Sequence, residues 1–156
     1  MLRSVLNKNN LAAHVFNSIA GYNYDYNDRF DAPRAAADDR TPEQLARAVF
    51  EGAPRPVRLF LVLGFRYGLG LRFGPRSSPE HVLGWAIIDR EPDSITLESR
   101  SWMLTSRLVF RTEESRVSMS TFVRYDRPIA KVTWPPVSLL HCQIVPRLVR
   151  RAAART

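Results

Sequence analysis

His141 is the side chain best suited to proton transfer, because imidazole titrates near neutral pH. It follows Leu140 in a segment whose apolar residues recur every three or four positions, so it could face a sheet and act as a general base. A hydrogen-bonded structural histidine is the alternative. The three histidines, His14, His81 and His141, lack metal-ligand spacing, and no nucleophile-elbow motif surrounds a serine. We therefore expect no metal or other cofactor.

Hydroxyl, apolar and aromatic side chains could form the wall of a small-molecule site. Strict alternation along 95–103 sends Leu97, Ser99 and Ser101 to one face, and alternation along 117–123 groups Met119 with Thr121. Trp85 and Trp134 could line a ligand or fill a core. Glu98 and Arg100 fall on the opposite face, which we expect to be solvated. The candidate ligand-binding residues are Trp85, Leu97, Ser99, Ser101, Met119, Thr121, Trp134 and His141.

The first part of the chain predicts two helices after an extended segment. Residues 11–19 have helix-like apolar spacing, and Tyr22, Tyr24 and Tyr26 then alternate as in an edge strand, where they could also form a binding face. Thr41 with Gln44 forms a capping box that predicts a helix ending near Gly52. A second helix is expected from about Pro56 to Tyr67.

From His81 onward the pattern favours strands. Residues 82–99 read as a hairpin around a charged turn, and 116–126 as a long strand. PIAKVTWPP reads as a further extended piece. The apolar spacing of 137–150 predicts a closing helix, which Pro146 should kink or divide.

Size and charge limit the classes of protein that the chain can belong to. Its 156 residues fit one domain, with 1–20 as a possible N-terminal extension. The net charge of +8 comes from dispersed arginines, so nucleic acid is an unlikely partner. A single cysteine excludes an internal disulfide and fits a reducing compartment. With no long apolar run to span a membrane, we expect a cytoplasmic protein.

Strands followed by a helix that lies along them define an α+β class. The order strand, helix pair, sheet, long helix resembles the helix-grip fold of the START and polyketide-cyclase superfamily (SRPBCC). The segments YDYNDRFDAP, PEQLARAVFEGAP, LGWAIIDREPDSITLES and WPPVSLLHCQIVPRLVRRA resemble the bacterial family of domain of unknown function 2867. The resemblance implies a curved antiparallel sheet wrapped around a long C-terminal helix, with two shorter helices after the first strand and a ligand cavity between sheet and helix.

Three functional hypotheses follow. The first is a protein that binds an apolar or amphipathic small molecule in that cavity. The second is a cyclase-like or hydrolase-like enzyme that uses the same cavity with His141 as base. The third is an interaction module with a filled core, whose arginine-rich C-terminus meets an acidic partner. Ligand identity and oligomeric state are not encoded in any motif.

Overall fold

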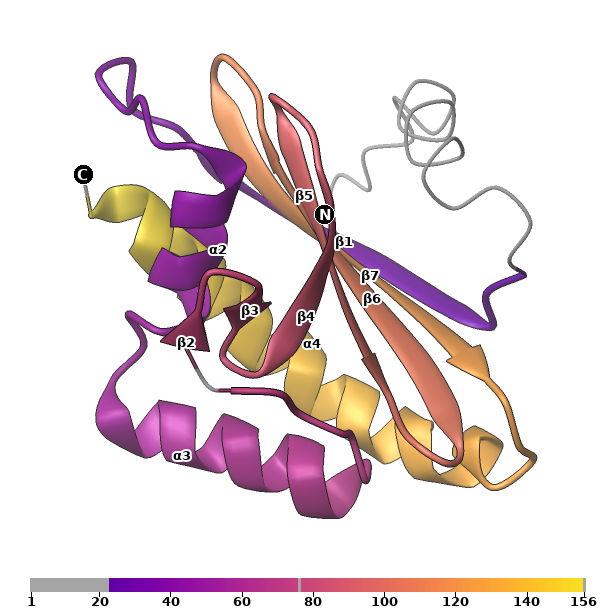
Figure 1. The fold of residues 1–156 in the computed structure, drawn as a ribbon. Helices are drawn as coiled ribbons and strands as arrows, with labels where there is room; N and C mark the ends of the chain where they lie inside the picture. The colour runs from indigo at the N-terminus through magenta and orange to yellow at the C-terminus, as the bar shows by residue number, and fades with distance from the viewer. Residues whose placement is uncertain (1–22, 76, 156) are drawn as a thin grey trace.

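The computed structural model describes residues 23–75 and 77–155, so the helix expected at 11–19, the extension 1–20 and Tyr22 lie outside the described residues. The chain forms an α+β structure in which helices cover one face of an antiparallel sheet (Figure 1). The elements in chain order are β1 (Tyr26–Pro33), α2 (Pro42–Phe50), α3 (Arg55–Leu63), the π-helical turn η1 (Gly64–Gly68), β2 (Ser77–Ser78), β3 (His81–Val82), β4 (Trp85–Arg90), β5 (Ser94–Arg100), β6 (Leu104–Thr112), β7 (Arg116–Tyr125) and α4 (Ala130–Ala154).

The seven strands of the described residues pair in the order β1-β7-β6-β5-β4-β3-β2, and every pair is antiparallel. Sequential neighbours therefore form a meander from β2 to β7. The exception is β1, which pairs with the last strand, β7, at the opposite edge from β2. The two helices α2 and α3 occupy the connection between β1 and that meander.

Helix α2 begins where the sequence predicts. The Thr41 hydroxyl accepts a hydrogen bond from the Gln44 amide, and the Gln44 side chain accepts one from the Thr41 amide. This reciprocal cap satisfies two amides that have no partner within the helix. Leu45 and Val49 are then buried on the face of α2 that packs on the sheet.

The hairpin expected within 82–99 is confirmed as β4 and β5, but its first residues belong to a turn. Leu83 and Gly84 have φ of 46° and 86°, and they join β3 to β4 as a two-residue loop between the paired residues Val82 and Trp85. Two positive φ angles match the right-handed twist of a hairpin. Phe73 packs where a Cβ on Gly84 would stand, so this position requires glycine.

Strand β7 shows the predicted alternation. Val117, Met119, Thr121 and Val123 are all buried on the face that carries the helices, which we call the inner face. The register pairs Thr121 with Asp28 of β1 and with Leu108 of β6. These three residues therefore share the inner face.

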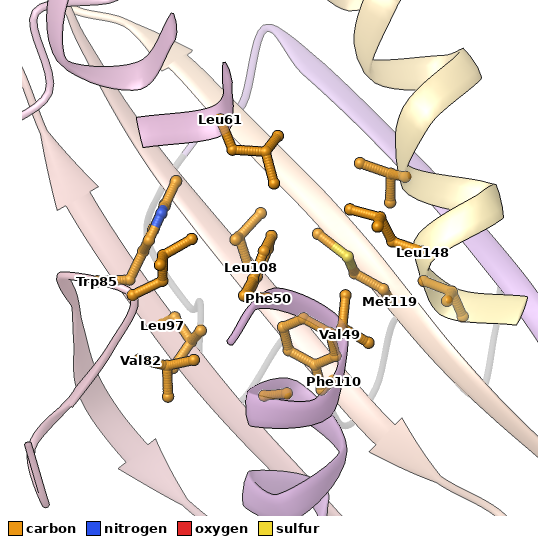
Figure 2. Packing of buried hydrophobic residues seen from close by; sticks show 14 of the residues in the cluster. Val49, Phe50, Leu61, Val82, Trp85, Leu97, Leu108, Phe110, Met119 and Leu148 are labelled. Carbon is orange, nitrogen blue, oxygen red and sulfur yellow. The ribbon is translucent and has the colours of Figure 1, made fainter. Parts of the chain in front are cut away.

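The core lies between the inner face and the helices. Phe50 of α2 meets Phe110 of β6 edge-to-face, with ring centroids 5.7 Å apart. Figure 2 shows Val49 and Phe50 over the sheet, with Leu148 of α4 beside Met119. Both α2 and α4 pack on the sheet and on each other. Most of the folding free energy of such a layered domain comes from this apolar burial.

Helix α4 is longer than expected, and the prediction of an extended PIAKVTWPP is wrong. The helix begins at Ala130 and runs through Pro135, Pro136 and Pro146 without a break. Ala130 and Trp134, four residues apart, are both buried on one face of the helix. This burial favours the helix although proline tends to interrupt one. Among the described helices, none combines the length and hydropathy needed to cross a membrane.

Candidate functional site

A cavity of about 310 Å³ lies between the inner face, α4 and the α3–η1 segment. Its floor is formed by β4, β6 and β7, and the end of α2 closes one side. Figure 2 shows Trp85, Leu61, Leu108 and Met119 around this space. The lining side chains are mostly apolar and include five Phe and Trp rings that come from five different elements: Phe50, Phe60, Phe65, Trp85 and Trp134.

Two polar side chains that line this pocket, Thr121 and His141, meet where α4 packs on β7 and β1, and a third, Ser106, comes from β6. His141 Nε2 lies 3.0 Å from Thr121 Oγ1 and 3.0 Å from Asp28 Oδ2. The side chains of His141 and Asp28 are only 10% and 13% exposed. We call Asp28, Thr121 and His141 the polar corner. Its position follows from the register, because Asp28 and Thr121 are directly paired on neighbouring strands.

Tyr26 supports the polar corner from β1. Its hydroxyl donates a 2.7 Å hydrogen bond to Asp28 Oδ2 and lies 3.4 Å from Cys142 Sγ. Burial raises the pKa of Tyr26 above its ordinary value, and Cys142 and Asp28 raise it further, so the phenol stays protonated. The Tyr26 ring also meets Trp134 edge-to-face at 5.2 Å. Tyr26 therefore ties α4 to the edge strand at this corner.

The polar corner does not have the geometry of a nucleophile triad. In a triad the carboxylate and the hydroxyl contact opposite nitrogens of the imidazole, so that one orients the ring while the other gives up its proton. Here Asp28 and Thr121 contact the same nitrogen, Nε2 of His141. The arrangement orients a hydroxyl and an imidazole at the pocket wall, as in a hydrogen-bonding site for one polar group of a ligand.

Trp85 forms the wall of the pocket on the side of α3 and η1. Its ring packs edge-to-face on Phe65 of η1 at 5.5 Å and lies 6.4 Å from Phe73. The indole nitrogens of Trp85 and Trp134 are buried and have no hydrogen-bond partner. Buried donors of this kind are uncommon and need an explanation such as a water molecule or a ligand.

Two glycines, Gly64 and Gly68, also line the pocket from the α3–η1 segment. A Cβ added at either position would meet no atom within 4 Å. Gly64 has helical φ and ψ of −62° and −45°, so its backbone does not require glycine. The absence of side chains at these two positions leaves room at the pocket wall.

Five of the eight candidate residues from the sequence line this pocket. They are Trp85, Met119, Thr121, Trp134 and His141, which come from β4, β7 and α4. The alternation of β7 and the apolar spacing of α4 carried the signal that placed Met119, Thr121 and His141 on the inner side. Whether they bind a ligand stays a prediction.

The structure does not place the other three candidates in the pocket. Leu97 points inward but is fully buried in the core. Ser99 donates its hydroxyl to the Arg72 carbonyl, because the chain between η1 and β2 crosses that end of β5. Ser101 lies beyond the end of β5, so alternation no longer applies, and its hydroxyl accepts hydrogen bonds from the amides of Met103 and Leu104.

Two residues of this site, Asp28 and Tyr26, were not among the candidate ligand-binding residues from the sequence. Asp28 was missed because a charged residue in an edge strand is typical of a solvent-facing position. Its pairing with Thr121 depends on β1 meeting β7, which no local pattern shows. Tyr26 was only one of three alternating tyrosines. The structure separates them, since Tyr24 precedes β1 and packs against Phe122 on the outer face at 5.1 Å.

The expectation that Glu98 is solvated is wrong. Glu98 is only 12% exposed and makes ion pairs of 2.7 Å with Arg100 and with Arg107. Burial by itself would raise the pKa of Glu98, but the hydrogen bonds from these two arginines outweigh it and lower the pKa. Long arginine side chains on a sheet face bury the carboxylate between them.

These features define an α+β protein with an apolar pocket between an antiparallel sheet and its helices, and with one polar corner. Within residues 23–75 and 77–155, no group of three or more His, Cys, Asp or Glu side chains is placed to hold a metal ion. Comparison of the chain with protein-family models, curated proteins and solved structures finds no match. The pocket geometry is therefore the basis for a functional proposal.

Proposed function

We propose that this is a small-molecule-binding protein of the helix-grip type, which holds an amphipathic ligand between the sheet and α4. The observation that carries the proposal is the cavity of about 310 Å³, which falls within the size range of small-molecule sites. The order of elements and the pairing of β1 with β7 support the helix-grip assignment. The likeness to domain of unknown function 2867 is part of the same proposal.

The chemistry of the wall indicates the kind of ligand. Side chains such as Leu108, Met119 and Val137 offer only dispersion contacts, so most of the ligand should be apolar. The polar side chains of the lining are few: the Thr121 hydroxyl and the His141 imidazole of the polar corner, and the Ser106 hydroxyl of β6. A ligand with a hydrocarbon or aromatic body and one oxygen at its end matches both features.

Benzophenone and diphenylmethane test this match directly. They have the same two rings, and only benzophenone has a carbonyl oxygen. Isothermal titration calorimetry should show that both bind, with benzophenone preferred by about two- to tenfold, which is the range of one net hydrogen bond. Native mass spectrometry of the freshly purified protein should also show a bound apolar compound.

Thr121→Val is the variant that isolates the polar corner, because valine keeps the shape of threonine without its hydroxyl. We expect it to abolish the preference for benzophenone while diphenylmethane still binds. Thr96→Val is the matched control, since Thr96 is equally buried but lies on the outer face. Failure of both compounds to bind, together with a clean native mass, would exclude an apolar ligand of this size.

A further inference from the structure

The two helical segments that border the pocket carry large apolar side chains on the surface of the protein. On the α3–η1 segment, Leu59, Leu63 and Tyr67 are 56%, 46% and 74% exposed. On α4, Val132 and Leu139 are 71% and 69% exposed. Single exposed apolar residues are common on protein surfaces, but exposed apolar residues that recur along two segments indicate an interaction surface.

This surface borders the opening of the pocket. Phe60 of α3 and Leu140 of α4 both line the pocket, and each is 50% exposed. The pocket therefore opens between α3 and α4, which both contribute residues to its lining. We call the exposed apolar residues of these two segments the rim: Leu59, Phe60, Leu63, Tyr67, Val132, Leu139 and Leu140.

The charged side chains of the two stretches that carry the rim all have one sign. The sequence has no Asp or Glu from Gly52 to Pro79 or from Arg127 to Thr156, the two stretches that contain α3, η1 and α4. Arg55, Arg66 and Lys131 are exposed on these segments beside the apolar side chains. Arg66 also lies over the Tyr67 ring at 5.7 Å, which keeps a cation next to an exposed aromatic group.

We propose that the rim docks on the surface of an anionic phospholipid bilayer. Apolar side chains can enter the boundary between headgroups and acyl chains while neighbouring cations contact the anionic headgroups. The rim has both parts, and its lack of carboxylates removes the repulsion that an anionic surface would exert. Docking does not require a ligand in the pocket, and it would place the pocket opening against the acyl chains of the bilayer.

Sedimentation with lipid vesicles tests the proposal. We expect the protein to bind vesicles of phosphatidylcholine and phosphatidylserine in equal parts, to bind phosphatidylcholine alone much more weakly, and to be released by salt. Arg66→Gln and Lys131→Gln should each weaken binding by about fivefold. Arg116→Gln is the control for charge, because Arg116 lies at the start of β7 and pairs with Glu113.

Apolar substitutions separate docking from simple charge attraction. Leu59→Glu and Leu139→Glu should each weaken vesicle binding by about tenfold or more, because neither leucine could then enter the bilayer. Ile88→Glu is the matched control, since Ile88 is an exposed apolar residue of β4, outside both segments. Circular dichroism should show unchanged thermal unfolding for all three variants.

Three results would overturn the proposal. The first is the absence of binding to the mixed vesicles at low salt. The second is binding that Leu59→Glu and Leu139→Glu leave intact. The third is a dimer in solution that the same two variants dissociate, because the rim would then be covered by a second copy. Calorimetry with diphenylmethane on these variants separates a failure of the docking proposal from a failure of the proposed ligand pocket. Neither leucine lines the pocket, so both variants should still bind diphenylmethane.

Discussion

Gly64 offers a substitution that should block the pocket without damaging the fold. The position lines the pocket, has helical backbone angles and has open space where a Cβ would stand. Glycine is about 1 kcal/mol less favourable than alanine or leucine inside a helix. Gly64→Ala and Gly64→Leu should therefore both stabilise the protein.

The two variants should differ in how much of the pocket they fill. If each added carbon takes roughly the 30 Å³ of a water molecule, alanine occupies about a tenth of the 310 Å³ cavity and leucine more than a third. Forcing a ligand into an overfilled site costs about 1–3 kcal/mol, or roughly five- to hundredfold in affinity. Gly64→Ala should keep its affinity for benzophenone, and Gly64→Leu should lose it.

Calorimetry with benzophenone measures the affinity, and thermal unfolding measures the stability. For a chain of 156 residues, 1 kcal/mol corresponds to a rise in Tm of about 2–4 °C. Equal affinity in the alanine and leucine variants would show that benzophenone does not occupy this pocket. A lower Tm in both would contradict the open space and the helical backbone on which the reasoning depends.

Two further predictions concern stability. Asp28→Ala removes the acceptor of the Tyr26 hydroxyl and the partner of His141, so urea unfolding should show a loss of about 1–3 kcal/mol in stability. The control is Asp31→Ala, on the exposed side of β1, which should change stability by less than about 0.5 kcal/mol. Equal losses in the two variants would refute the role of Asp28. Hydrogen bonds from Arg40 lower the pKa of Asp38 from 3.8 to about 2. Because the carboxylate is favoured in the folded state, it contributes about 2 kcal/mol above pH 4, and this contribution is lost as the pH falls towards 2. Asp38→Asn should therefore be less stable than the wild type at neutral pH and equally stable near pH 2, with exposed Asp39→Asn as control; a difference that persists at pH 2 would contradict the assignment.

The sequence by itself determined the features that depend on neighbouring residues. The capping box of Thr41 and Gln44 positions α2, and the alternation of β7 places Met119 and Thr121 on the inner face. Caps and periodicities act within a few residues, so their physical basis is complete in the local sequence. The α+β class followed from their order along the chain.

The tertiary structure decided the backbone conformation at positions where local sequence preferences conflict with burial. Helix α4 continues through Pro135 and Pro136 because burial of Trp134 against the edge strand favours it. Leu83 and Gly84 alternate like strand residues in the sequence but form a turn, since β3 and β4 must reverse there. For Trp134 the deciding contact is with Tyr26, which is distant in sequence, whereas the turn follows from the pairing of Val82 with Trp85.

The pocket also depended on the tertiary structure. The partnership of Asp28 with His141 joins residues from opposite ends of the described chain, and it exists only because β1 pairs with β7 beneath α4. The cavity depends on the distance at which α3 and η1 stand from the sheet, and no residue type encodes an unfilled volume. The sequence specified the side chains of the inner face, and the packing of distant elements decided which of them enclose a pocket.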